Sequence, residues 1–139
     1  MPQKILHGLD GSEGSFKALV EALALAKCGP AKLHLITVEE VPQYAGAMGE
    51  VIEAKDAANG AYATALERAR QMAAAEGVEF EAHVFLGHEV KTIVEFVREG
   101  GYDLLVIGFM GHSAVYDRVM GSTCQSLVRL APCSVLVVK

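Results

Sequence analysis

Glycine and hydroxyl-bearing residues gather after the fourth of five predicted strands, in a spacing suited to holding phosphate. Gly108 and Gly111 follow that strand, and Gly121, Ser122 and Thr123 stand at the start of a predicted helix. Glycine lets the backbone come close to a ligand, and the unpaired N–H groups of a helix N-terminus attract phosphate oxygens. These residues therefore predict an anion site, although neither the Walker A pattern GxxxxGK[ST] nor the dinucleotide pattern GxGxxG occurs.

A second group follows the first predicted strand, where Gly8 and Leu9 precede Asp10. In an open α/β sheet, ligands bind at the carboxyl ends of strands where the strand order reverses. A carboxylate there accepts hydrogen bonds from paired hydroxyls. Asp10 also stands three residues before Glu13, so helix capping by this pair is the alternative to ligand binding. The same two carboxylates are a candidate pair for a magnesium ion.

The elements that must position these groups alternate between strand and helix. The first predicted helix carries Phe16, Leu19, Val20 and Leu23 on one face, and Gly29 follows it. The predicted strands cover residues 4–7, 33–38, 78–86, 103–107 and 134–138, and the later helices cover residues 51–75, 90–99 and 122–130. This alternation predicts one doubly wound α/β domain over residues 1–139, with a five-stranded parallel sheet and helices on both faces.

Composition narrows the class of protein. The chain has 139 residues, of which 52% are hydrophobic and 21% charged, and its net charge is −5. It has no basic cluster, so we expect no nucleic-acid binding. It has no apolar run of about 18 residues and no signal-peptide architecture, so we expect a cytoplasmic protein that does not enter membranes. Its three cysteines form no CxxC motif, so a disulfide framework or a thiolate zinc site is not expected.

The histidines show no metal-ligand spacing and are expected to be strand or surface residues. They are His7, His34, His83, His88 and His112. His112 lies in the glycine-rich loop, so contact with a phosphate is its alternative role. Arg118 stands three residues before Gly121. It either neutralises a phosphate or is solvated.

The glycine spacing resembles the ATP-binding pattern of the universal stress protein family, G-x2-G-x9-G-[ST]. Gly108, Gly111, Gly121 and Ser122 match this pattern without a gap. The family's terminal segment is similar to the tail around Ala131-Pro132-Cys133. Its first strand and turn are similar to Ile5-Leu6 followed by Asp10-Gly11-Ser12. The resemblance implies a sheet of order 3-2-1-4-5 and a homodimer formed through the final strand, Ser134 to Lys139.

The resemblance also implies ATP as the ligand, with Mg²⁺ as a candidate companion. Asp10 matches the acidic residue that holds the ribose or the adenine edge, with Gly8 and Leu9 beside it, and Val38 matches the position whose backbone meets adenine. The phosphate group would be surrounded by Gly108, Gly111, Gly121, Ser122 and Thr123. His7-Gly8-Leu9 and Phe109-Met110 depart from the usual family residues, so the shape of the pocket is expected to differ.

We therefore expect an ATP-binding regulator or sensor of the stress response that acts through nucleotide-dependent conformation and dimerisation. At most slow ATP hydrolysis is expected, because no Walker-type lysine is present. Nucleotide binding would order the segment Glu39 to Glu50 and change a surface that a partner recognises. This segment is either a surface loop or a lid over the nucleotide. One alternative is a slow ATP-hydrolysing enzyme of the adenine-nucleotide α-hydrolase-like group, which steady phosphate release would reveal. Another is a nucleotide-free dimerisation module, whose melting would not respond to nucleotide.

Overall fold

Five parallel strands form one sheet in the order β3-β2-β1-β4-β5. The computed structural model describes residues 2–40, 48–110 and 120–139, with the backbone alone for residues 48–61. The elements are β1 (Lys4–Gly8), α1 (Glu13–Cys28), β2 (Lys32–Glu39), α2 (Met48–Ala75), β3 (Phe80–Leu86), α3 (Glu89–Gly100), β4 (Leu104–Gly108), α4 (Ser122–Leu130) and β5 (Ser134–Val138). The predicted alternation, the strand order and the five-stranded sheet are confirmed.

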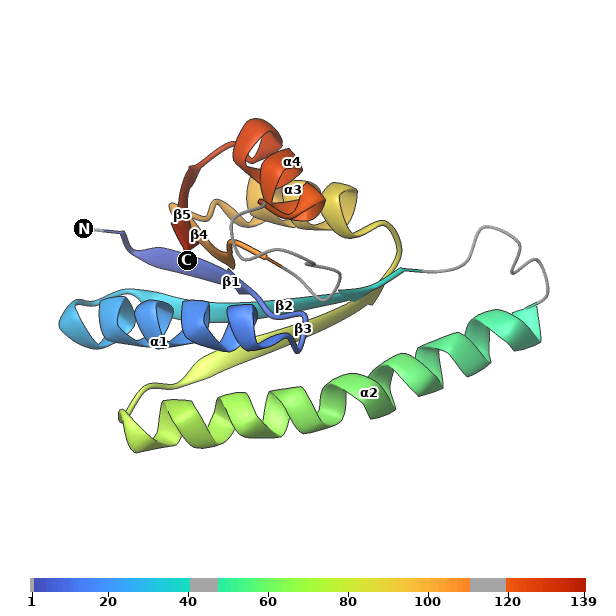
Figure 1. Cartoon of the computed structure of the whole chain (residues 1–139). Helices are drawn as coiled ribbons and strands as arrows, with labels where there is room; N and C mark the ends of the chain where they lie inside the picture. The colour runs from blue at the N-terminus through green and yellow to red at the C-terminus, as the bar shows by residue number, and fades with distance from the viewer. Residues whose placement is uncertain (1, 41–47, 111–119) are drawn as a thin grey trace.

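Helices cover both faces of the sheet, with α1 and α2 on one face and α3 and α4 on the other (Figure 1). Each pair of helices buries its own apolar cluster against the strands. Successive residues of a strand point to opposite faces, so Ile5 joins the cluster under α1 while Leu6 joins the one under α3 and α4. Burial on both faces explains why the central strands are apolar without alternation.

Helix α1 buries a face that differs in one respect from the predicted one. Three of the four predicted residues are buried, but Val20 is 54% exposed. Ala18 and Ala22 are fully buried instead. Small side chains let the helix axis lie close to the sheet, and the position of Val20 on the helix leaves it on the solvent side.

The strand order reverses between β1 and β4, which lie side by side in the centre of the sheet. β1 pairs with both neighbours in parallel, with His7 opposite Leu35 of β2 and Val106 of β4. The chain leaves β1 towards one side and β4 towards the other, so their carboxyl ends border a crevice. Among the helices that the structure describes, none combines the length and apolar character needed to cross a membrane.

Candidate functional site

A cleft of about 220 Å³ lies at the carboxyl ends of β1 and β4, between the N-termini of α1 and α4. Six of the nine residues predicted from the sequence line it, and they come from three separate segments. They are Gly8, Asp10, Gly108, Gly121, Ser122 and Thr123. The fold therefore brings both predicted groups to one place.

The remaining predicted residues do not line the cleft or lie outside the described residues. The side chains of Leu9 and Val38 are buried, with exposed fractions of 2% and 7%. The backbone of Leu9 fixes the end of β1, because its N–H donates to the carbonyl of Ile36 and its carbonyl accepts from the Thr37 hydroxyl. The predicted backbone contact of Val38 stays a prediction. The described residues do not include Gly111, His112, Arg118 and residues 41–47 of the Glu39 to Glu50 segment.

The N-terminus of α4 reaches the cleft without a side-chain cap. Its N-cap residue is Gly121, whereas the N-caps of α1 and α3 are Ser12 and His88, whose side chains accept backbone N–H bonds. The first bond inside α4 runs from Gln125 N to Gly121 O at 3.0 Å. The amides of residues 122–124 precede this bond, so they and the helix dipole are suited to an anionic group in the cleft.

Gly108 allows β4 to end in close contact with α1. A Cβ atom at Gly108 would lie 2.9 Å from both the carbonyl carbon and the oxygen of Gly14. A Cβ atom at Gly14 would in turn lie 2.7 Å from the carbonyl oxygen of Met110. Both distances are far below van der Waals contact and involve backbone atoms. Glycine at these two positions therefore serves packing, whatever binds in the cleft.

Asp10 orders the turn between β1 and α1. Its Oδ1 accepts hydrogen bonds from the Ser12 N–H at 2.9 Å and the Ser12 hydroxyl at 2.5 Å. The Ser12 Oγ in turn accepts from Ser15 N at 3.2 Å, so Ser12 is the N-cap of α1. The predicted capping box of Asp10 and Glu13 is therefore wrong. These bonds hold the Asp10 carboxylate at the wall of the cleft.

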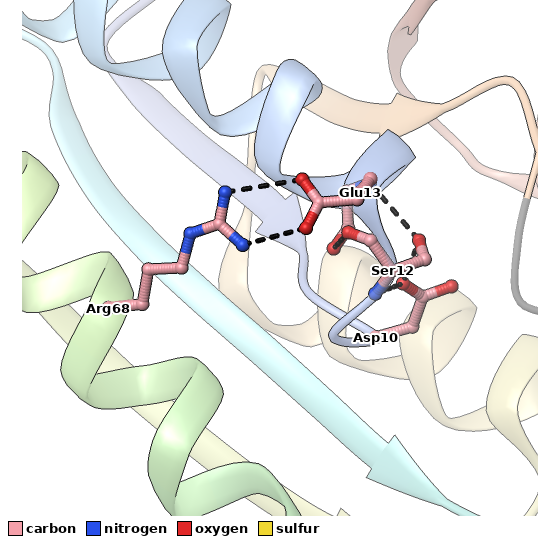
Figure 2. Close-up of polar contacts among 5 residues, drawn as sticks. Asp10, Ser12, Glu13 and Arg68 are labelled. Carbon is pink, nitrogen blue, oxygen red and sulfur yellow. Dashed lines mark hydrogen bonds and ion pairs between the residues drawn. The ribbon is translucent and has the colours of Figure 1, made fainter.

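Glu13 is engaged by α2 rather than by the cleft. Figure 2 shows the Arg68 guanidinium pointing at the Glu13 carboxylate. Its two terminal nitrogens donate to the carboxylate oxygens at 2.9 and 3.2 Å. The same guanidinium lies 3.9 Å from the centre of the Phe16 ring. Hydrogen bonding from Arg68 lowers the pKa of Glu13. Glu13 is paired with Arg68 and does not line the cleft, where the carboxylates among the described residues are Asp10 and Glu89.

Tyr62 of α2 and Glu89 of α3 are cleft residues that the sequence did not reveal. Tyr62 and Asp10 also border an adjoining cavity of about 450 Å³ that Phe16 and Arg68 help to line. Burial raises the pKa of Tyr62 to about 12, with Glu39, Asp10 and Glu89 adding to the effect. The phenol therefore stays protonated at neutral pH. Its position follows from how α2 crosses the sheet, which sequence spacing does not report.

The charge on the described lining of the cleft is negative. Among the described residues that line it, Asp10 and Glu89 are acidic and none is lysine or arginine. Within this described lining, amides and hydroxyls provide the hydrogen-bond donors for an anion. Asp10 and Glu89 would repel a bound phosphate, and a divalent cation held by these carboxylates would reduce that repulsion.

His7 lies fully buried in β1 beneath the cleft. Its Nδ1 donates to the carbonyl oxygen of Val106 at 3.1 Å, and within the described part of the chain Nε2 has no hydrogen-bond partner. Burial lowers the pKa of His7 to about 4. The imidazole is therefore neutral at pH 7 and has a structural role.

Comparison with known proteins places the chain in a family. The sequence matches the universal stress protein family over residues 1–139. It is 31% identical to the universal stress protein YxiE of Bacillus subtilis over 148 residues, covering all of both chains. The structure superposes on the universal stress protein UspA from Lactobacillus plantarum with a TM-score of 0.85 and 25% identity, covering 99% of this chain and 97% of that one. A universal stress protein solved in complex with cAMP gives a TM-score of 0.77 and 28% identity, with 99% and 97% coverage. The chain belongs to the universal stress protein family.

Proposed function

We propose that the cleft binds ATP and that the protein is a nucleotide-dependent regulator acting in the cytoplasm. The observation that carries the proposal is that the uncapped N-terminus of α4 and the Asp10 carboxylate open onto the same cleft. Phosphate suits the helix terminus, and a sugar suits the carboxylate. The similar protein solved with cAMP supports an adenine nucleotide as the class of ligand.

Each cleft residue has a role in this proposal. Ser122 and Thr123 bind phosphate oxygens through amides and hydroxyls, and Gly121 keeps the helix terminus open to them. Asp10 binds the ribose or the adenine edge beside Gly8. By resemblance to the family, Gly111 and the main chain of Leu9 and Val38 complete the site. Gly108 acts through packing, because it sets the distance between β4 and α1.

Magnesium is part of the proposed ligand. Asp10 and Glu89 repel the phosphates of free ATP, and no described lysine or arginine lines the cleft to offset them. Mg²⁺ is commonly held by phosphates together with one or two carboxylates. We therefore expect MgATP to bind more tightly than ATP in the presence of EDTA.

Isothermal titration with MgATP tests the site through two matched carboxylate variants. Asp10→Asn keeps an oxygen for the two Ser12 bonds but removes the charge, so it is expected to fold and to lose one charge-assisted hydrogen bond. Such a bond contributes about 1.5–3 kcal/mol, or roughly 10- to 100-fold in Kd. Glu13→Gln is the control, because Glu13 faces Arg68 and not the cleft.

Two results would count against the proposal. Equal affinity in the parent and in Asp10→Asn would remove Asp10 from the ligand site. A parent protein that releases no binding heat with MgATP, and none with AMP, would overturn the nucleotide assignment and favour the dimerisation module.

A homodimer through β5 is a second part of the proposal, because β5 is an edge strand of the sheet. The carbonyl of Val138 accepts from Phe109 N on the β4 side. Successive residues of a strand direct their backbone groups to opposite sides, so the N–H of Val137 points to the open edge. Proline at an edge position removes only an outward donor. We expect sedimentation velocity to show a dimer for the parent and a monomer for Val137→Pro, whereas a monomeric parent would refute the dimer.

A further inference from the structure

Two histidines and a glutamate meet on neighbouring strands far from each other in the sequence. His34 of β2 pairs in register with Glu81 of β3, and His83 lies two residues further along β3, so all three point to one face of the sheet. His34 Nδ1 lies 3.0 Å from His83 Nε2 and 3.4 Å from Glu81 Oε2. The three ligand atoms lie within 4.8 Å of one another.

Aromatic side chains surround the two imidazoles. The His34 and His83 rings lie nearly in one plane, with 9° between them and their centres 5.3 Å apart, so they meet edge to edge through the 3.0 Å contact of Nδ1 with Nε2. Tyr102 meets His34 edge-on at 5.2 Å, and Phe96 packs on His83 at 4.7 Å. The side chain of His34 is 12% exposed and that of Glu81 is 72% exposed. The imidazoles are therefore enclosed by aromatic neighbours, whereas the carboxylate is open to water.

We propose that His34, Glu81 and His83 form a binding site for a divalent transition metal of the Zn²⁺ class, with water as the fourth ligand. Zn–N bonds of about 2.0–2.1 Å at tetrahedral angles place neighbouring ligand atoms about 3.4 Å apart. The two distances at His34 Nδ1 lie within a few tenths of an ångström of this spacing. Because Nδ1 and Nε2 face each other in a hydrogen bond, each imidazole must turn for the ion to replace that bond. Two imidazoles and one carboxylate are also a donor set that zinc accepts in open sites.

The charges around the site predict a modest affinity. Glu81 is the one carboxylate in the cluster, whereas Lys4 and Lys32 both act electrostatically on His34. Lys4 is turned towards α3, where its ammonium donates to Gly100 O at 2.6 Å and lies 4.6 Å from the centre of the Tyr102 ring. The bound ion would join β3, an edge strand, to β2, and would stabilise that edge of the sheet.

The metal site is independent of the proposed nucleotide site, because none of its three ligands lines the cleft. Titration calorimetry with ZnCl₂ in the absence of nucleotide therefore tests it alone. We expect one equivalent to bind the parent, and His34→Gln, His83→Gln and Glu81→Gln each to weaken binding by at least about tenfold. Glu81 is exposed, so its variant is expected to fold even if the histidine variants do not.

Two controls separate this site from other zinc ligands. His88→Asn removes an exposed histidine but keeps an oxygen that can cap α3, and Cys28→Ser removes the exposed thiol; both should bind zinc as the parent does. Substitution with Co²⁺ should give the visible absorption of a four-coordinate site in the parent and not in Glu81→Gln. A parent that binds no zinc, or three ligand variants that bind it as well as the parent, would overturn the proposal and leave a hydrogen-bonded histidine pair.

Discussion

Replacing Gly108 with alanine tests whether the first glycine of the phosphate-site spacing acts through packing. The added Cβ would lie 2.9 Å from the Gly14 carbonyl group and 3.3 Å from Ser15 N. These are backbone atoms of α1, so no side chain can swing aside to make room. Gly108 does not have a positive φ, so alanine is unfavourable here for steric reasons alone. Helix α1 would have to move away from β4.

Overpacking of this kind typically costs about 1–3 kcal/mol, which corresponds to a fall in Tm of about 3–10 °C for a chain of this size. Urea denaturation of the parent and of Gly108→Ala, without nucleotide, measures the change. Gly8→Ala is the matched control at the neighbouring strand end, because its Cβ would make an ordinary 3.4 Å contact with Ile107 Cγ2. We expect that variant to change the free energy of unfolding by less than about 1 kcal/mol. Equal stabilities for the two variants would refute the packing role of Gly108.

Two further stability predictions follow from polar groups near the cleft. Burial lowers the pKa of His7 from 6.5 to about 4, so between these values the unfolded chain binds more protons than the folded one. The free energy of unfolding therefore falls by about 3 kcal/mol as the pH falls from 7 to 4. Urea denaturation over this pH range should show a smaller fall in the free energy of unfolding for His7→Gln and an unchanged fall for the control, His88→Asn. Identical pH profiles in the parent and His7→Gln would contradict the attribution of this fall to His7. Ser12→Ala should lower the free energy of unfolding by about 1 kcal/mol, because α1 loses its N-cap. Ser12→Thr, which keeps a hydroxyl, should be nearly as stable as the parent. If Ser12→Ala is as stable as the parent, Ser12 does not cap the helix.

The sequence predicted the alternation of elements well, because it depends on local signals, whereas the strand order and its reversal point came from the resemblance to the family. Helix α4 begins and ends at the predicted residues, since Gly121 precedes it and Ala131-Pro132 follows it. The start of α1 was predicted less well, because Asp10 and Ser12 both carry oxygens that can cap a helix. The choice depends on the turn, in which Gly11 adopts a φ of 83° and Asp10 binds Ser12.

The parts of the molecule that the sequence missed depend on contacts between distant segments. Tyr62 and Glu89 reach the cleft only because α2 and α3 pack where they do. His34 and His83 are 49 residues apart and meet through the register of β2 with β3. Spacing along the chain carries no signal for either arrangement.

Thermal melting with and without MgATP, in the parent and in Gly121→Val, tests the central claim most directly. Gly121 has φ −62° and ψ 149°, an extended conformation that valine also adopts, so the variant should fold while its side chain obstructs the helix terminus. MgATP at 100 times its Kd should stabilise the parent by about 2.7 kcal/mol, or about 5–10 °C in Tm. The account predicts this shift in the parent and its loss in Gly121→Val. No shift in a folded parent, or an equal shift in both proteins, would contradict it.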